Sequence, residues 1–393
     1  GGRPVSPGLS SFLNMARWMA AWLVVCGHVR NMLLTDMGEL HGAGWAIKAF
    51  YFFTGFGHQS VIIFFVISGF LVGGMTLDRW RTHTPDPGAY FIARFSRIYT
   101  VLIPALIVGW VFDRTGAHWF ESSRMYANAL SEYSINSLPD HVLIRTDWLT
   151  ISGNLLNLQG ILVSPLGSNG PLWSLANEWW YYCLFAFVAM AFKSRAHRTV
   201  CALAALALAA LLPTQMLLWG ALWVMGLGAH VWVRAHIKKP NCTIAALLFL
   251  AAMAWTRLHH AQAGMALEFM ADAVVATTFC LLLVSLSTVR KPLPMANFHH
   301  WAAEFSFSTY LFHFPAMVFA AAALGQNGLI HLKAPPTGSQ LAVYAGMVLA
   351  LLAFSLLAYH LFEKHTSHIK QALSRYAMSA TSGVALDDRR TPI

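Results

Sequence analysis

Runs of about 20 apolar residues recur along this chain, and they constrain its fold more than any other feature. A helix of that length spans the hydrocarbon core of a bilayer. The composition agrees, because 57% of the 393 residues are hydrophobic and only 11% are charged, whereas soluble domains carry about 25% charged residues. The runs are too long and too uniform for the strands of a membrane barrel. The sequence therefore predicts an all-α, polytopic membrane protein.

The apolar runs predict about ten transmembrane helices, over residues 11–34, 59–77, 96–113, 171–192, 199–213, 215–233, 243–258, 266–288, 304–325 and 340–362. The third is expected to be short and split by Pro104. With the N-terminus inside, this layout puts 18 of the 26 Lys and Arg residues in inner segments and seven in outer segments. Because basic residues collect in cytoplasmic loops, both termini are predicted to be cytoplasmic.

One membrane domain is expected over residues 1–375, followed by a polar tail, 376–393, that is predicted to be disordered. The formal net charge of +10 fits basic loops against anionic lipid, so no nucleic-acid partner is expected. The five cysteines form no CxxC pair and the histidine doublets cannot face one point on a helix, so no metal site is expected. The outer segments 36–58 and 114–170 are interpreted either as surfaces for a polar partner such as a sugar or as interfacial segments on lipid.

The first span carries Arg17 and His28 within its apolar run. Eleven residues at about 100° each make almost three full turns, so the two side chains share one helix face, about 16 Å apart along the axis. A titratable group inside a bilayer is costly and indicates function. That face is predicted to line a polar passage; the alternative is that His28 is a packed core histidine and that Arg17 extends to a head group.

Four further motifs follow the first helix: FFVISGFLVG at 64–73, RFSRIYTVLIP at 94–104, GPLWSLANEWWYY at 170–182 and SFSTYLFHFP at 306–315. Together with the R-x10-H spacing of Arg17 and His28, and in this order, they resemble the membrane-bound acyltransferase-3 family. These are bacterial integral-membrane enzymes that O-acylate glycans and some other acceptors. The resemblance covers about residues 10–365 and is to the stand-alone form of the family.

The resemblance implies acyl transfer, most commonly of acetyl, from cytoplasmic acyl-CoA to an acceptor hydroxyl in the bacterial inner membrane. It makes His28 the essential histidine and Arg17 its basic partner. It also makes Arg94 and Arg97 the basic pair of the third span, and Glu178 the acidic residue of the Trp-Ser-Leu motif. The expected acceptor is an exopolysaccharide, another surface glycan or its lipid-linked precursor, and a homo-oligomer is possible. No permanently bound cofactor is expected, because acyl-CoA is a co-substrate.

The residues themselves suggest matching roles. Transfer from a thioester to a hydroxyl needs a base, for which His28 is the candidate, and cations for the phosphates of CoA. Arg94 and Arg97 are i,i+3 neighbours on one helix face and are suited to bind these phosphates. Arg17 would contact acyl-CoA as it enters from the cytoplasm. Glu178 needs a partner within the span. It is interpreted as orienting His28, as holding the acceptor, or as a salt-bridge partner of Arg17.

The remaining candidates have weaker support. Ser68 is placed in the acyl-CoA site, but it has no base at helical spacing and suits close helix packing better than a nucleophile's role. Trp173 and Ser174 are candidates for acceptor binding or cavity lining, with Trp173 stacking on a sugar or lying in the interfacial belt. Tyr310 and His313 share a helix face and either line the same cavity or form a core pair.

Two mechanisms and one other function remain open from the sequence. Acyl transfer is expected to be direct, with His28 as general base, or to pass through a transient acyl-histidine. The alternative function is a proton-coupled transporter or flippase that uses Arg17, His28 and Glu178 as a relay. That function predicts paired broken helices in two related halves, which the sequence does not display.

Overall fold

A computed structural model describes residues 5–130, 134–259 and 264–387 of the chain. The described residues form helices joined by loops and short turns, without a named strand. The α-helices are α1 (Pro7–Leu33), α2 (Trp45–Phe53), α3 (Gly57–Ser68), α4 (Gly74–Thr82), α5 (Pro87–Trp119), α6 (Trp148–Leu155), α7 (Leu172–Lys193), α8 (Arg198–Leu211), α9 (Thr214–Arg234), α10 (Cys242–Leu258), α11 (Met265–Leu286), α12 (Ala296–Glu304), α13 (Ser306–Gln326), α14 (Gly338–Leu361) and α15 (Thr366–Asp387). The all-α fold predicted from the sequence is confirmed.

Seven helical segments of the described chain are long and apolar enough to cross a membrane: Pro7–Leu33, Trp45–Thr82, Pro87–Trp119, Thr214–Arg234, Met265–Leu286, Ser306–Gln326 and Gly338–Ser379. Two further apolar helices, α8 and α10, are shorter. All ten predicted spans fall on helices, but the number ten is not confirmed, because α7, α8 and α10 are not among the seven. Because several of its helices can span a membrane, the chain is a multi-pass membrane protein.

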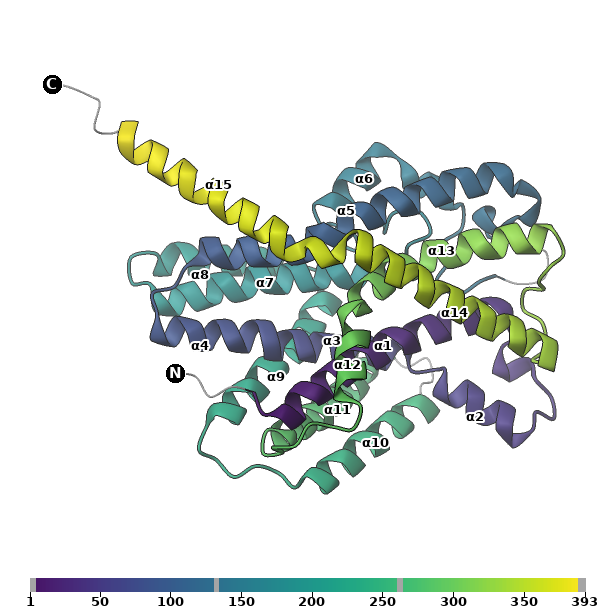
Figure 1. The fold of residues 1–393 in the computed structure, drawn as a ribbon, viewed down its shortest axis with the longest axis horizontal. Helices are drawn as coiled ribbons and strands as arrows, with labels where there is room; N and C mark the ends of the chain where they lie inside the picture. Colours follow the sequence, from purple (N-terminus) through teal and green to yellow (C-terminus); the bar gives the residue numbers. More distant parts are fainter. Residues whose placement is uncertain (1–4, 131–133, 260–263, 388–393) are drawn as a thin grey trace.

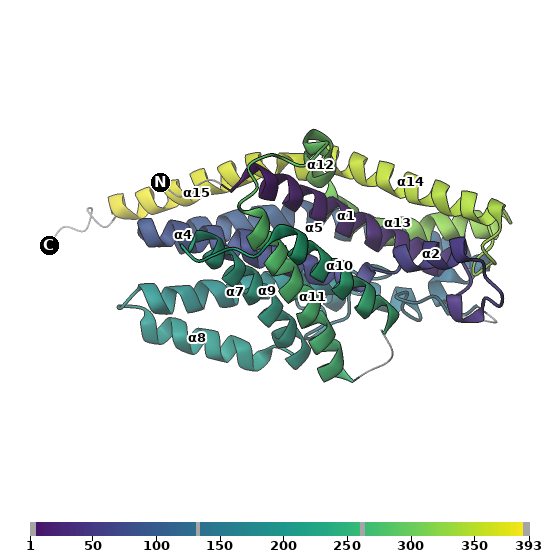
Figure 2. The same cartoon turned by 90° about the horizontal axis from the view of Figure 1, so that it is seen from below.

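Helix α1 lies near the centre of the ribbon in Figure 1 and toward one edge of it in Figure 2. It packs against α3, α12, α13 and α14, and α13 in turn packs against α5. On the other flank α9 packs against α3 and α11, and α7 pairs with α8. The start of α1 and the end of α15 lie toward the same side of the bundle in both views. Met19 of α1 is 40% exposed, so the helix is not enclosed on every side, but Arg17 faces the cavity and His28 faces α13 rather than lipid.

The third predicted span differs from its expectation. Helix α5 covers 33 residues and continues through Pro104, so it is neither short nor split there. A proline removes one backbone donor, but in a membrane bundle neighbouring side chains and small local adjustments satisfy the carbonyl that it frees. Packing of α5 along α13 holds the helix in one piece.

A π-helical turn, Gly69–Gly73, joins α3 to α4. It begins directly after Ser68 and lies against α9 at very short range, since a Cβ on Gly69 would be 1.8 Å from the carbonyl oxygen of Trp223. Gly226 of α9 approaches α3 in the same way, because its Cβ would be 2.0 Å from the carbonyl oxygen of Val66. Small residues let membrane helices approach this closely, and π-turns are frequent at functional sites. This contact fixes the position of Ser68.

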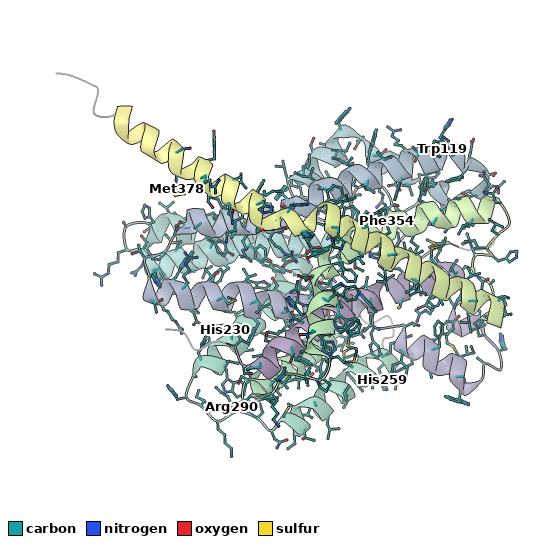
Figure 3. The ribbon with its side chains drawn as sticks, viewed as in Figure 1. Trp119, His230, His259, Arg290, Phe354 and Met378 are labelled. Carbon is teal, nitrogen blue, oxygen red and sulfur yellow. The ribbon has the colours of Figure 1, made fainter. Side chains whose placement is uncertain are left out.

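At the other end of the chain, α15 continues to Asp387, into the segment 376–393 for which the sequence predicts disorder. It extends the line of α14 beyond the bundle, and Met378 marks its outer part in Figure 3. The first turns of α15 pack against α5. The disorder of the tail stays a prediction, and residues 388–393 lie outside the described part of the chain.

Candidate active site

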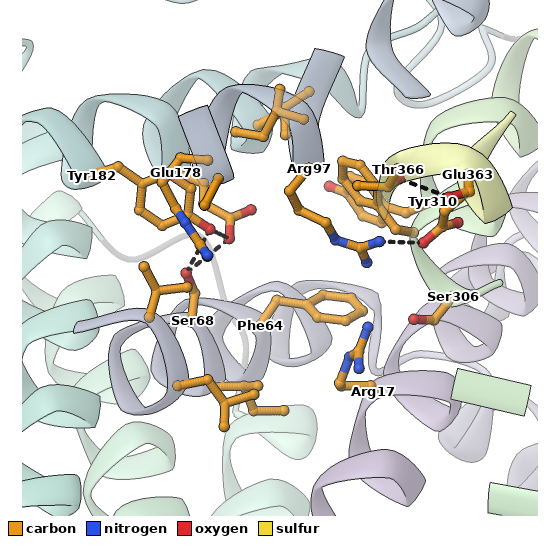
Figure 4. Close-up of a pocket in the computed structure, with 18 of the residues that line it drawn as sticks. Arg17, Phe64, Ser68, Arg97, Glu178, Tyr182, Ser306, Tyr310, Glu363 and Thr366 are labelled. Atoms are coloured by element: carbon orange, nitrogen blue, oxygen red, sulfur yellow. Dashed lines mark hydrogen bonds and ion pairs between the residues drawn. The ribbon is translucent and has the colours of Figure 1, made fainter. Parts of the chain in front are cut away.

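A cavity of about 670 Å³ lies between α1, α3, α5, α7, α13 and the junction of α14 with α15. This volume is within the range of small-molecule sites. Five cationic and three acidic residues are among those that line it: Arg17, Arg94, Arg97, Lys364, Lys370, Glu178, Glu304 and Glu363. Figure 4 shows Arg17 on the α1 side, with Ser68 and Glu178 at one end and Arg97 with Glu363 at the other. The charged side chains around the cavity sum to a net positive charge, and the cavity lies toward the predicted cytoplasmic end of α1.

Glu178 is held by two hydroxyl groups at one end of this cavity. Ser68 Oγ donates to Glu178 Oε1 at 2.8 Å, and the hydroxyl of Tyr182 donates to the same oxygen. Trp223 Nε1 donates to Ser68 Oγ at 3.1 Å, which ties the group to α9. Tyr182 follows Glu178 by four residues, so one helix face presents both. Ser68 therefore acts as a hydrogen-bonded link between helices in this structure.

The interpretations of Glu178 that gave it a contact with His28 or Arg17 need correction. Among the described residues its hydrogen bonds go to Ser68 and Tyr182, and it forms no ion pair. The reason is tertiary, since α3 brings Ser68 between α1 and α7 at that level of the bundle. Glu178 still faces the same cavity as Arg17, so the holding of a substrate group remains open to it.

The other end of the cavity is closed by an ion pair. Arg97 Nη1 lies 2.6 Å from Glu363 Oε1. The second carboxylate oxygen of Glu363 accepts from the backbone N–H of Ser308 at 3.0 Å and from its hydroxyl at 2.6 Å. The carboxylate is buried, with 4% of Glu363 exposed. Arg97 is thus positioned by the end of α14 and the start of α13, while Arg94 lies over the rings of Tyr90 and Tyr182.

His28 has a histidine as its partner. Its Nδ1 lies 2.9 Å from Nε2 of His313, and the two rings are nearly parallel, with their centroids 5.2 Å apart. His313 Nδ1 lies 2.9 Å from the carbonyl oxygens of both Thr309 and Tyr310. Since carbonyl oxygens only accept, His313 carries its proton on Nδ1, and its Nε2 is an acceptor in the neutral ring.

The direction of the next hydrogen bond follows from this tautomer. His28 must donate its Nδ1–H to His313 Nε2, so in the neutral His28 ring Nε2 has a free lone pair. His313 is fully buried, whereas His28 is partly exposed. Phe314 meets the His28 ring edge-on, at 4.9 Å between centroids, and limits its rotation. The geometry thus presents one nitrogen of His28 as a base.

Tyr310 lies between the cavity and the histidine pair. It lines the cavity, and its ring centroid is 6.2 Å from that of His313. Its hydroxyl is 2.6 Å from Ser174 Oγ and donates to the carbonyl of Pro171 at 3.2 Å. One aromatic side chain therefore separates the cationic cavity from the histidine pair, and α7 fixes that side chain in place.

The backbone around the pair is also arranged by the SFSTYLFHFP motif. Pro315 has no N–H, so it cannot bond the carbonyl of Leu311 one turn earlier. Asn169 supplies the missing donor through Nδ2, at 2.9 Å from that oxygen. Asn169 belongs to the long outer segment, which therefore reaches into the bundle beside the histidines. This contact gives one physical reason for Pro315 in its motif and for Asn169 directly before the motif at 170–182.

The candidate residues predicted from the sequence fall into two groups. The cavity is lined by Arg17, Ser68, Arg94, Arg97, Ser174, Glu178 and Tyr310. His28, His313 and Trp173 are not among its lining residues. Trp173 packs on Trp219, with centroids 4.8 Å apart, and on Phe65, and its stacking on a sugar stays a prediction. The cavity and the pair are connected through Tyr310.

Sequence reasoning missed some residues of the site. Tyr182 was visible as the i+4 neighbour of Glu178 on a membrane helix, which is a usable signal. Glu363 and Lys370 lie outside the motifs identified from the sequence. They line the cavity because the junction of α14 with α15 packs against α5, a tertiary contact that short-range spacing does not encode.

The length of the match to a protein-family model determines the family to which the chain belongs. A family model described as an acyltransferase domain, that of acyltransferase-3, matches residues 10–360. The chain belongs to the acyltransferase-3 family. The match includes the histidine pair of this acyltransferase and the cavity residues from Arg17 to Tyr359, while Glu363, Lys364 and Lys370 lie beyond it. No match was found to a curated protein or to a solved structure.

Proposed function

We propose that this membrane acyltransferase moves an acyl group, most commonly acetyl, from cytoplasmic acyl-CoA to a hydroxyl of a glycan or its lipid-linked precursor. The site of action is a bacterial inner membrane. One observation carries the proposal: a cationic cavity at the predicted inner end of α1 adjoins, through Tyr310, a histidine pair whose His28 Nε2 is free. The family supplies the reaction class, acyl transfer.

The cations of the cavity support acyl-CoA as donor. CoA carries several phosphate charges, and guanidinium groups suit phosphate oxygens. Arg17 and Arg94 form no ion pair with an acidic residue in the described part of the chain, whereas Arg97 forms one with Glu363. The pantetheine arm then extends past Tyr310 toward His28, which lies about 16 Å beyond Arg17 along α1. The donor's phosphates remain at the inner end.

The reaction proposed at His28 is direct transfer. His28 Nε2 takes the proton of the acceptor hydroxyl as the oxygen attacks the thioester carbonyl carbon. The tetrahedral intermediate collapses, the C–S bond breaks and the new ester is released. His28 returns the proton to the thiolate sulfur of CoA. His313 accepts the Nδ1–H bond throughout and stabilises the imidazolium that forms, as a buried acceptor does in a Ser-His-Asp triad.

An acyl-histidine route would use the same lone pair as nucleophile. It predicts a burst of labelled enzyme when radiolabelled acetyl-CoA is added without acceptor, and direct transfer predicts none. The hydrogen bond to His313 leaves this lone pair available for either route, so the burst measurement decides between them.

The decisive experiment measures CoA release by the purified protein. Wild type and His28→Ala are supplied with acetyl-CoA and a panel of oligosaccharide acceptors. We expect acceptor-dependent release from wild type and a loss of at least 100-fold in the variant, as general-base catalysis typically contributes. Phe312→Leu, on the α13 side that stacks on Phe362, is the control for packing. Equal release from wild type and His28→Ala with every acceptor would sink the proposal.

A further inference from the structure

Two arginines meet at the end of α1 that lies away from the cavity. Arg30 Nη1 donates to the carbonyl oxygen of Tyr51 at 2.9 Å, and Arg257 Nη2 donates to the same oxygen at 3.1 Å. The two nitrogens are therefore no farther apart than the sum of those distances. Arg257 comes from the last turn of α10, whose end is marked by His259 in Figure 3. Two positive charges thus converge at the predicted outer end of the bundle.

No acid compensates this pair in the part of the chain that the structure describes. The ion pairs found there involve neither Arg30 nor Arg257. Asp36, six residues after Arg30, has both carboxylate oxygens bound by Lys333 at 2.9 Å. The Arg257 Nε is buried and has no hydrogen-bond partner. A half-buried charge at a membrane needs a counter-charge, and none of the described acids forms an ion pair with either arginine.

The fold makes room for these guanidinium groups. A Cβ on Gly55 would lie 2.0 Å from Arg257 Nε and 2.3 Å from its Cζ, so the guanidinium fits only because residue 55 is glycine. Arg30 lies over the ring of Tyr51, 5.2 Å from its centroid, and bonds Thr54 Oγ1 at 3.2 Å. Both side chains are held in defined positions rather than extended into solvent. Such preorganisation is typical of a binding site.

A purely structural role accounts for part of the arrangement. Helix α2 ends at Phe53, and cations near a helix C-terminus stabilise its unpaired carbonyls. One guanidinium is enough to bond the Tyr51 carbonyl, however, and a second one adds repulsion between like charges. The second arginine and the buried Arg257 Nε remain unexplained by capping. An external anion satisfies both.

The arginine pair lies close to His28. Arg30 Nη2 donates to Asn31 Oδ1 at 2.8 Å. Asn31 follows His28 by three residues, so it shares the face of α1 that carries His28 and lies about 4.5 Å farther out along the axis. A molecule with an anionic group at Arg30 and Arg257 would thus have its neighbouring hydroxyl groups within reach of His28.

We propose that Arg30 and Arg257 bind an anionic group of the acceptor, a carboxylate or phosphate oxygen. The acceptor is then an acidic glycan, such as a uronate-containing one, or a sugar on a lipid diphosphate. This inference rests on the proposed function, because the anion site would orient the acceptor of that reaction toward His28. It concerns binding rather than catalysis and can fail independently.

The test is a binding measurement without acyl-CoA, on the full-length chain in nanodiscs of zwitterionic lipid and in the His28→Ala background. One probe is a fluorescent tetragalacturonate, compared with its carboxyl-reduced neutral counterpart; the second is a polyprenyl-diphosphate disaccharide, compared with the same disaccharide alone. The two probes separate a carboxylate from a lipid diphosphate as the source of the anion. We expect at least one anionic probe to bind about tenfold or more tightly than its neutral counterpart, and raised salt to weaken that binding.

The variants decide which residues are responsible. Arg257→Gln removes the charge, and Gly55→Ala keeps it but pushes the guanidinium away. Each is expected to weaken anion binding by about tenfold to 100-fold, the range for a lost charge-assisted hydrogen bond. Arg114→Gln is the matched control, because Arg114 is exposed, lies in a predicted outer segment and contacts Trp110. Thermal unfolding of each variant checks that it is folded. If Arg257→Gln does not fold, the test uses Gly55→Ala, provided that its melting temperature equals that of wild type; unchanged anion binding by that variant would contradict the inference.

Three results would overturn the inference. They are equal binding of anionic and neutral probes, absence of binding by both anionic probes, and an equal effect of Arg114→Gln and Arg257→Gln. In each case CoA release dependent on His28 still tests the proposed function separately. Conversely, anion binding in the His28→Ala background together with absence of CoA release from wild type would keep the site and remove the acyltransfer assigned to it.

Discussion

The hydrogen bond between His28 and His313 allows one prediction to be worked through in detail. The substitution His313→Phe keeps a ring at a fully buried position but removes the acceptor for His28 Nδ1–H. The donor is then left without its 2.9 Å partner, and the tautomer with Nε2 free is no longer favoured. Leaving a buried donor unsatisfied costs about 1–3 kcal/mol. Because this bond strengthens as His28 takes a proton, we expect the loss to appear in the transition state.

That range converts to a rate effect of about 5- to 150-fold, since about 1.4 kcal/mol is tenfold. The loss should fall on kcat, whereas KM for acyl-CoA should change little, because His313 is not among the residues that line the cavity. His313→Gln should recover much of the rate, since its amide oxygen can accept from His28 Nδ1. Phe312→Leu on the same helix should leave the rate within a factor of two or three.

The assay is steady-state CoA release with a saturating acceptor, with kcat and KM for acetyl-CoA measured separately, and melting temperatures in detergent verify that each variant is folded. The reasoning is refuted if His313→Phe folds and retains wild-type kcat while His28→Ala does not. It is also refuted if His313→Gln and His313→Phe lose the same amount, because the acceptor atom would then not matter.

Two further predictions concern stability. Gly69→Ala should prevent stable insertion, because its Cβ would lie 1.8 Å from the Trp223 backbone oxygen. The control Gly228→Ala on α9 meets nothing within 4 Å and should accumulate normally in membranes. Comparable membrane levels of both variants would contradict the close packing of Gly69. Glu363→Ala should lower stability by about 1–3 kcal/mol, because it removes the buried acceptor of Ser308 and of the partly exposed Arg97 guanidinium. The measurement is thermal unfolding in detergent, and a melting temperature equal to wild type would show that the pair contributes nothing.

Much of the site could be predicted from the sequence because its residues stand on helices with short, regular spacing. Arg17 and His28 were assigned to one face of α1 by the 3.6-residue period alone. Arg94 and Arg97 were paired by the same rule, and both line the cavity. The length of the apolar runs also placed every predicted span on a helix. Information of this kind is local, and it is sufficient for the face of a helix and for its approximate limits.

The partners of those residues could not be predicted in the same way. Ser68 and Glu178 are 110 positions apart, and His28 and His313 are 285 apart. A helix face has several possible neighbours in a bundle of this size, and a single sequence does not choose among them. The interpretation of Glu178 as a partner of His28 was wrong for this reason. The continuous α5 is a related case, since the effect of Pro104 depends on the helices packed around it.

The arrangement of groups along α1 leads to one more expectation. Arg17 faces the inner cavity, His28 bonds α13, and Arg30 bonds the end of α2. A shift of α1 by one turn would break the contacts of His28 and Arg30 together, because neither partner repeats at that spacing. We therefore expect α1 to stay fixed while donor and acceptor approach from opposite sides. A cysteine cross-link between α1 and α13, away from the cavity, should leave CoA release intact. Loss of release on cross-linking, restored by reduction, would instead require α1 to move during the reaction.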